Sequence, residues 1–148
     1  MADVQTRTTP ITQTHRSLQS AFNRRDWDMI QGHIADDCVY IDQARGETAR
    51  GPEEVTALYR SWADAFLDGG IAEGAQFNLS ESTSISRFVG RGTQDGALGP
   101  FSPSGRYAET PFCEVLRFDE DGRVAYGEMY YDQLNMLMQL GHVPSPEG

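Results

Sequence analysis

The sequence predicts a single α+β domain in which helices pack on one face of a curved, mostly antiparallel sheet. Apolar residues recur at helical spacing in the first half of the chain, whereas runs with the period-two alternation of strands fall mostly in the second half. Helices followed by a run of strands typically place the helices together on one face of an antiparallel sheet. The length of 148 residues fits one domain.

Composition and charge argue against several classes of protein. The chain carries 12 basic and 22 acidic residues, a net charge of −10, so its surface repels phosphate backbones and anionic headgroups. Nucleic acid is therefore not an expected partner. No apolar run is long enough to cross a bilayer, so no membrane association is expected. The amino terminus lacks the basic start and apolar block of a secretory signal, and a cytoplasmic location is expected.

Two helices are predicted in the first quarter of the chain. The first covers residues 12–23 behind a threonine cap, and its buried face is formed by four residues at helical spacing: Ile11, His15, Leu18 and Phe22. The segment 26–34 repeats that spacing with Trp27, Ile30 and Ile34. Residues 1–11 are expected to form a flexible segment before a single domain that covers residues 12–141.

The first strand is predicted over residues 38–42, a run rich in β-branched and aromatic residues. Successive side chains of a strand point to opposite faces, so Cys38, Tyr40 and Asp42 lie on one face. Asp42 is therefore expected to point into the domain together with a tyrosine.

A loop over residues 46–51 leads into a third predicted helix. Pro52 and two acidic residues mark its start, and Gly69 and Gly70 mark its end. Its apolar stripe consists of Val55, Leu58, Tyr59, Trp62 and Phe66. This stripe is expected to form core, and its inner members are expected to line a pocket as well.

The second half of the chain is predicted to supply most of the sheet. Strands are expected at residues 76–80, 84–92, 107–118 and 123–132. Gly122 in the turn 119–123 indicates a hairpin between the last two strands. The stretch 96–105 is rich in glycine and proline and is predicted to be a loop able to flex over a pocket mouth. A short helix from the cap Asp132 to Gly141 closes the domain, and residues 142–148 form a frayed tail.

Neither a metal nor a cofactor is predicted. The histidines share no repeated ligand spacing, and the glycines at 90–92 and 96–99 lack the strand-to-helix context of a phosphate-binding loop. Cys38 and Cys113 lie far apart, and both are expected to be buried small hydrophobic residues.

A set of short segments has a recognisable pattern when it is considered with the order of the elements. The segments are Ala-Phe-Asn at 21–23, Trp-Asp at 27–28, Ala-Asp-Asp at 35–37, Leu-Gly-Pro-Phe-Ser-Pro-Ser-Gly at 98–105, Tyr-Asp-Gln at 131–133 and Gln-Leu-Gly at 139–141. Over residues 14–141 the chain resembles the SnoaL-like polyketide cyclases. That family is similar to the ketosteroid isomerases and to epoxide-opening cyclases. The resemblance implies a nuclear-transport-factor-like cone, an α+β barrel with one internal pocket.

The resemblance implies chemical roles for two acidic residues. The segment 35–42 is similar to the isomerase stretch that ends in the general-base aspartate, which puts Asp42 at that position. Glu114 falls where the isomerases have a protonated aspartic acid and the SnoaL-like cyclases have a histidine. The alternation of both strands agrees with these assignments, because it directs each side chain inward.

Three positions depart from the patterns of these families. Leu18 replaces the oxyanion-hole tyrosine of the isomerases, and Met129 replaces the SnoaL-like acid/base aspartate on the last strand. Gln94 stands where the family commonly has the histidine of a Gly-Thr-His motif. Candidates for the missing hydroxyl are Tyr131, Tyr40 and Tyr59.

Two carboxylic acids in one apolar pocket suggest a mechanism. Burial disfavours the charged form, and two like charges in one cavity tend to share a proton. We hypothesise that Asp42 takes a proton from a carbon next to a carbonyl, or activates a hydroxyl or water, while protonated Glu114 stabilises the oxyanion. In the alternative interpretation, Asp42 bonds backbone amides at the start of a loop, and Glu114 pairs with Arg91 or Arg117.

The sequence leaves three functions open. The first is a cofactor-free isomerase or cyclase of secondary metabolism that acts on a hydrophobic, carbonyl-bearing molecule of polyketide or terpenoid type. The second is epoxide hydrolysis or epoxide opening in the same pocket, and the third is a non-catalytic small-molecule-binding domain. A homodimer or higher homo-oligomer is also expected. The residues expected to contact the substrate are Leu18, Tyr40, Tyr59, Trp62, Phe66, Gln94, Phe112, Leu116, Met129 and Tyr131.

Overall fold

The computed structural model describes residues 9–146 and confirms the predicted α+β class. The elements follow in the order α1 (Pro10–Arg24), α2 (Trp27–Gly32), β1 (Ile34–Asp42), β2 (Glu47–Arg50), α3 (Gly51–Ala65), β3 (Gly70–Asn78), β4 (Thr83–Thr93), β5 (Tyr107–Phe118), β6 (Val124–Tyr131) and α4 (Gln133–Gln139). None of the helices within the described residues is long and apolar enough to span a membrane.

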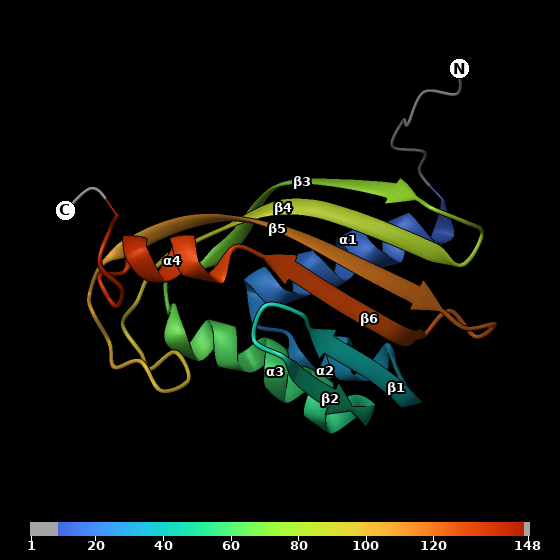
Figure 1. The fold of residues 1–148 in the computed structure, drawn as a ribbon. Helices are drawn as coiled ribbons and strands as arrows, with labels where there is room; N and C mark the ends of the chain where they lie inside the picture. Colours follow the sequence, from blue (N-terminus) through green and yellow to red (C-terminus); the bar gives the residue numbers. More distant parts are fainter. Residues whose placement is uncertain (1–8, 147–148) are drawn as a thin grey trace, which may run out of the picture.

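The strands form one curved sheet in the order β2-β1-β6-β5-β4-β3. All neighbours are antiparallel except β1 and β6, which run parallel. The helices α1, α2 and α3 lie on one side of this sheet (Figure 1). The sheet stays open between β2 and β3, so the predicted cone is a wrapped sheet and not a closed barrel.

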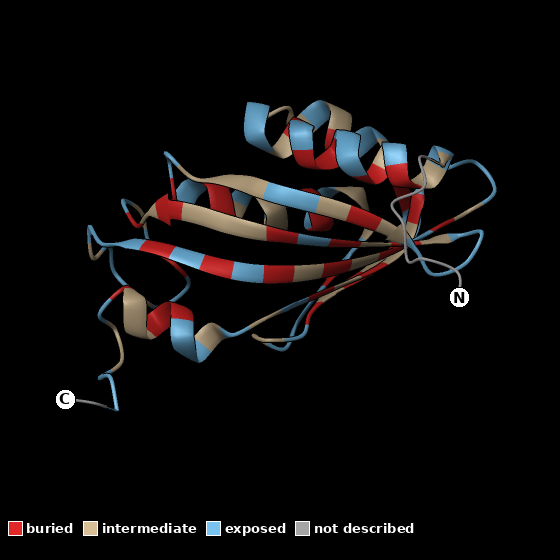
Figure 2. Cartoon of the chain, turned by 90° about the horizontal axis from the view of Figure 1, so that it is seen from above, coloured by how far each residue is buried: buried red, intermediate tan, exposed pale blue. Residues whose placement is uncertain are grey.

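The core lies between the concave face of the sheet and the helices. Buried and exposed residues alternate along the strands, and the buried residues of α1 face the sheet (Figure 2). On β5 this alternation turns Thr110, Phe112 and Glu114 inward. The strand thus presents two polar side chains and one aromatic ring to the interior.

The amino-terminal boundary of the domain differs from the prediction. The threonine that caps α1 is Thr9, and Pro10 occupies the first turn, so residues 10 and 11 belong to the helix and not to a flexible segment. The rest of the predicted flexible segment, residues 1–8, lies outside the described residues. At the other end, His142 of the predicted tail contacts Gln94, and residues 147–148 lie outside the described residues.

The largest errors in the predicted elements concern β1, β2 and β3. β1 begins at Ile34, where helical spacing predicted the end of a helix, because Ile34 pairs with Val124 of β6. Residues 47–50, predicted as a loop, form β2 by pairing with residues 39–42. β3 begins at Gly70, six residues before the predicted start, because residues 70–72 pair with residues 89–91 of the next strand, β4. Pairing with a neighbouring strand overrides the local pattern in all three cases, and for β1 this partner lies far along the chain.

The prediction for the cysteines is confirmed only for Cys38, which is buried. Cys113 is half-buried, because it points to the outer face of β5 between the inward residues Phe112 and Glu114. Both thiols are free.

We predict that Gly127→Ala destabilises the protein through a clash with Tyr40. A Cβ at Gly127 would lie 2.3 Å from Cδ2 of Tyr40, whose side chain is fully buried. Overpacking of this kind costs about 1–3 kcal/mol in the free energy of unfolding. Chemical denaturation measures the loss. Gly32→Ala is the control, because a Cβ added there would have no atom within 4 Å apart from its chain neighbours and the backbone of its own helix. A Gly127→Ala variant as stable as the wild type would contradict the prediction.

Candidate functional site

One apolar cavity lies between the helices and the concave face of β4, β5 and β6. Its walls are Leu18, Gln19, Phe22, Ile30, Tyr59, Trp62, Phe66, Gly69, Gly70, Ile71, Phe88, Gly90, Arg91, Gly92, Ala108, Thr110, Phe112, Glu114, Met129 and Met136. The half-buried wall residues Phe22, Ile71 and Gly90 mark the side on which it meets solvent. Its volume of about 80 Å³ is below the roughly 150 Å³ of an apolar cavity that binds benzene, so a ligand with rings must also occupy this mouth.

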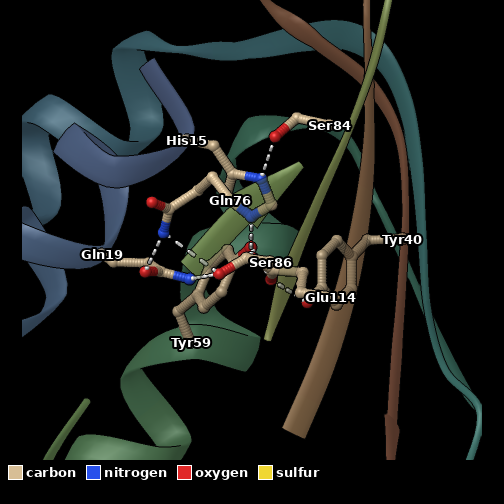
Figure 3. A network of polar contacts seen from close by, with 8 residues as sticks. All are labelled: His15, Gln19, Tyr40, Tyr59, Gln76, Ser84, Ser86 and Glu114. Carbon is tan, nitrogen blue, oxygen red and sulfur yellow. Dashed lines mark hydrogen bonds and ion pairs between the residues drawn. The ribbon is translucent and has the colours of Figure 1, made fainter. Parts of the chain in front are cut away.

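Glu114 is the acidic residue of this cavity, and it is 3% exposed. Its Oε1 lies 2.9 Å from Nε2 of His15. Its Oε2 accepts hydrogen bonds from the hydroxyls of Tyr40 and Tyr59, the latter at 2.5 Å. These partners come from α1, β1 and α3, and they converge on the carboxyl in Figure 3. Three elements far apart in sequence therefore hold one buried acid.

The partners of Glu114 determine its charge. Burial raises the pKa of Glu114, but the hydrogen bond and charge of His15, together with the hydrogen bonds from both tyrosines, outweigh it, and the pKa lies below the usual 4.5. Burial and the neighbouring carboxylate raise the pKa of Tyr40 and of Tyr59 well above 10, so both remain hydrogen-bond donors. Glu114 is thus a carboxylate near neutral pH, and its predicted protonated state is wrong.

A second layer of polar contacts fixes His15. Its Nδ1 lies 2.8 Å from Oγ of Ser84 on β4. Next to this pair, Gln19 donates to Oγ of Ser86, and Nε2 of Gln76 donates to Oε1 of Gln19 at 2.9 Å (Figure 3). All five side chains are buried. The histidine is therefore held at both ring nitrogens and cannot turn away from Glu114 without breaking a buried hydrogen bond.

Asp42 is fully buried but has different partners. Its Oδ1 accepts hydrogen bonds from the backbone amides of Ala44 at 3.1 Å and Arg45 at 3.0 Å, and its Oδ2 accepts one from the Tyr131 hydroxyl at 2.9 Å. Burial raises the pKa of Asp42, against the opposing effect of these hydrogen bonds. This is the alternative interpretation of Asp42, in which it caps the turn after β1.

The predicted sharing of a proton between the two acids is wrong. Met129 is paired with Asp42 on one side and with Glu114 on the other, so two strand spacings, about 10 Å, separate the backbones of the acids. Asp42 is not among the residues that line the cavity, and no hydrogen-bond partner is common to both carboxyls. The predicted pairing of Glu114 with Arg91 or Arg117 is also wrong, because its partners are His15 and two tyrosines.

The predicted substrate-contacting residues divide into two groups. Those that line the cavity are Leu18, Tyr59, Trp62, Phe66, Phe112 and Met129. Those that do not are Tyr40, Gln94, Leu116 and Tyr131. Tyr40 and Leu116 lie in the core, and the Tyr131 hydroxyl is bound to Asp42. Gln94 donates to the carbonyls of Gly96, Phe101 and Ser102, so it holds the loop 96–105 in place.

His15 is the important site residue that sequence reasoning missed. It was placed on the buried face of the first helix, and this placement was its only signal. A fully buried histidine needs polar partners. Glu114 is 99 residues away in sequence, and helical periodicity carries no information on such a contact.

A family model described as SnoaL-like polyketide cyclase matches residues 12–140. The chain belongs to this family. Family members are typically cyclases or isomerases. No curated protein matches the sequence.

Solved structures support the fold of this SnoaL-like protein. A SnoaL-like polyketide cyclase described as putative, from Jannaschia sp. CCS1, has a TM-score of 0.81 at 16% identity and covers 97% of this chain and 98% of its own. A protein described as a putative hydroxylase from Streptomyces galilaeus has a TM-score of 0.77 at 21% identity, with 91% and 83% covered. A hypothetical protein with a ketosteroid isomerase-like fold, from Catenulispora acidiphila DSM 44928, has a TM-score of 0.73 at 17% identity, with 86% and 92% covered. At these identities the likeness shows the fold alone.

Proposed function

We propose that this SnoaL-like protein is a cofactor-independent isomerase or cyclase that removes a proton from a carbon next to a carbonyl. The substrate class is a hydrophobic metabolite of polyketide or terpenoid type. The observation that carries the proposal is the position of Glu114, a carboxylate in the wall of an otherwise apolar cavity. Perturbed acids in such cavities are characteristic of acid/base sites.

The hydrogen bonds of Glu114 leave room for one more. A carboxylate has about four acceptor sites, and His15, Tyr40 and Tyr59 occupy three of them. The remaining site on Oε1 accepts the proton from the substrate carbon, while the electron pair of the broken C–H bond moves onto the carbonyl oxygen. Return of the proton to another carbon completes an isomerisation. In a cyclisation, the enolate carbon attacks a second carbonyl to close a ring, and Glu114 returns its proton to the alkoxide oxygen that this attack forms.

Asp42 has a supporting role in this proposal. Its carboxyl orients Tyr131, whose ring packs against Phe112 and Trp62 with centroids 4.7 and 5.3 Å away. Asp42 is thus a positioning residue for the aromatic wall of the cavity, and Glu114 replaces it as the proposed base.

A non-catalytic ligand-binding domain is the second candidate. It is favoured by Met129, which stands at the position of the acid/base aspartate of the family and offers no proton. Epoxide opening needs an acid for the epoxide oxygen in addition to a base, and Glu114 as a carboxylate supplies only the base.

Hydrogen exchange of a simple ketone distinguishes the two candidates. We expect the protein to accelerate the replacement of the α-hydrogens of 2-tetralone by deuterium in D₂O, measured by proton NMR against buffer and against heat-unfolded protein. Binding of 2-tetralone without acceleration would overturn the proposal in favour of the binding domain. The expected homodimer is a separate proposal, which sedimentation of the same sample checks.

A further inference from the structure

Two polar side chains of the cavity wall have no hydrogen-bond partner. Among the described residues, Nε1 of Trp62 and Oγ1 of Thr110 are buried atoms without a partner. Trp62 is 8% exposed and Thr110 is 2% exposed, and both residues line the cavity. Unpaired buried polar groups are destabilising and rare in native proteins, so each requires an explanation.

The surroundings of the indole explain why it stays unpaired within the protein. Trp62 packs against the rings of Phe66, Phe112 and Tyr131, and the Tyr131 hydroxyl already donates to Asp42. Its N–H is a donor only, so any partner must bring an acceptor oxygen. Thr110 faces Gly90 across the β4–β5 pair, where the glycine offers no side chain to bond its hydroxyl.

Trp62 and Thr110 can each be placed relative to Glu114 from the elements that carry them. Trp62 follows Tyr59 by three residues on α3, a rise of about 4.5 Å, and the Tyr59 hydroxyl bonds Glu114. Thr110 lies four residues from Glu114 on the same face of β5, about 13 Å along the strand. Trp62 packs against Phe112, which lies two residues from Glu114 on the inward face of β5, and Thr110 lies on the other side of Phe112, opposite Gly90.

We propose that Trp62 Nε1 and Thr110 Oγ1 are hydrogen-bonding subsites for two separate oxygen atoms of the substrate. Trp62 donates to the carbonyl oxygen that gains negative charge when Glu114 takes the α-proton. Thr110 binds a hydroxyl or carbonyl oxygen at the opposite end of the molecule. The substrate is thus an apolar, elongated molecule oxygenated at both ends. This inference rests on the proposed function for the role of Trp62, whereas the Thr110 subsite concerns binding alone.

Beside Thr110, β4 carries a glycine, and the Phe112 ring occupies the place that a side chain at this position would take. A Cβ at Gly90 would lie 2.7 Å from Cε2 of Phe112, so any larger residue there would push that ring within the cavity. Gly90 therefore allows the Phe112 ring to keep its position in the cavity wall next to Thr110.

The Thr110 subsite is tested with two ketones that differ by one hydroxyl. The wild type is expected to bind 6-hydroxy-2-tetralone about three- to tenfold more tightly than 2-tetralone, which is the usual gain from one hydrogen bond. Thr110→Val should reduce this preference to none and raise Tm by about 2–4 °C, because an unpaired hydroxyl is removed. Thr110→Ser keeps the hydroxyl and should keep the preference. If Thr110→Val and Thr110→Ser prefer 6-hydroxy-2-tetralone over 2-tetralone to the same degree, the proposal that Thr110 is a subsite is overturned.

The Trp62 subsite is tested by the rate of exchange. Trp62→Phe keeps an aromatic ring but removes the N–H, and the exchange rate of bound 2-tetralone is expected to fall by about 10²-fold, the typical loss of one oxyanion donor. Trp27→Phe is the matched control, because Trp27 does not line the cavity. A wild-type exchange rate in Trp62→Phe would overturn this role.

Failure of the subsites and failure of the proposed function give different results. Binding of the two ketones is measured by ligand NMR without any turnover, and it is repeated in Glu114→Gln. If the proposed function fails, exchange is absent but the selectivity of Thr110 for the hydroxyl remains measurable. If the subsites fail, the exchange that depends on Glu114 persists while the preference of the wild type for the hydroxylated ketone is absent.

Discussion

Glu114→Gln is expected to slow the exchange of 2-tetralone by about 10²- to 10⁴-fold, which is the usual contribution of a general base. Glutamine has nearly the same shape, and its Oε1 still accepts hydrogen bonds, but its amide takes no proton at neutral pH. The loss should appear in the rate at saturating ketone, while the dissociation constant changes little. Proton NMR of the same samples gives both quantities.

Glu128→Gln is the matched control for this variant. Glu128 lies on β6 next to Met129, points to the outer face, and bonds Gln43 and Tyr130 instead of the cavity residues. Its replacement should leave the exchange rate unchanged. Exchange at the wild-type rate in Glu114→Gln would remove Glu114 from the mechanism and would require another group as the base.

His15→Leu is expected to lower the free energy of unfolding by about 3–5 kcal/mol, the typical cost of removing one partner of a buried ion pair. The variant leaves the Glu114 carboxylate buried with only the two tyrosine donors, and it leaves the Ser84 hydroxyl without its histidine partner. Chemical denaturation at pH 7 measures the change. His33→Leu is the control, because that ring bonds only the Met29 carbonyl and its loss should cost about 0.5–1.5 kcal/mol.

A double-mutant cycle separates the buried charge from simple loss of packing. Adding Glu114→Gln to His15→Leu should restore part of the stability, because the uncompensated charge is then absent. If the effects of the two substitutions on the free energy of unfolding are additive, Glu114 carries no charge that His15 compensates.

The pH dependence of stability has a defined sign. The pKa of Glu114 is lower in the folded protein than its usual 4.5, so its contribution to stability is present above pH 4.5 and is lost as the pH falls below that value. Without His15, the pKa of Glu114 should rise, and this acid-dependent part of the stability should shrink. For the wild type and for His15→Leu, the quantity to compare is the difference in the free energy of unfolding between that protein and its Glu114→Gln counterpart. This difference cancels the contributions of the other carboxyls.

The sequence alone determined the class of the fold and the direction of most site residues. Period-two alternation turned Tyr40, Asp42 and Glu114 inward, and all three side chains are buried. Helical spacing placed His15 on the buried face of α1 and Tyr59 on α3. These predictions succeeded because periodicity is a local property, which records the side of an element that is apolar.

The tertiary structure decided which inward residues meet. The parallel pairing of β1 with β6 puts Met129 between Asp42 and Glu114, and the packing of α1 brings His15 to Glu114 instead. Strand order and register depend on contacts between segments up to about a hundred residues apart, which no local pattern encodes. The sequence therefore showed that two acids point inward, but only the folded chain determined that one of them faces the cavity as a carboxylate.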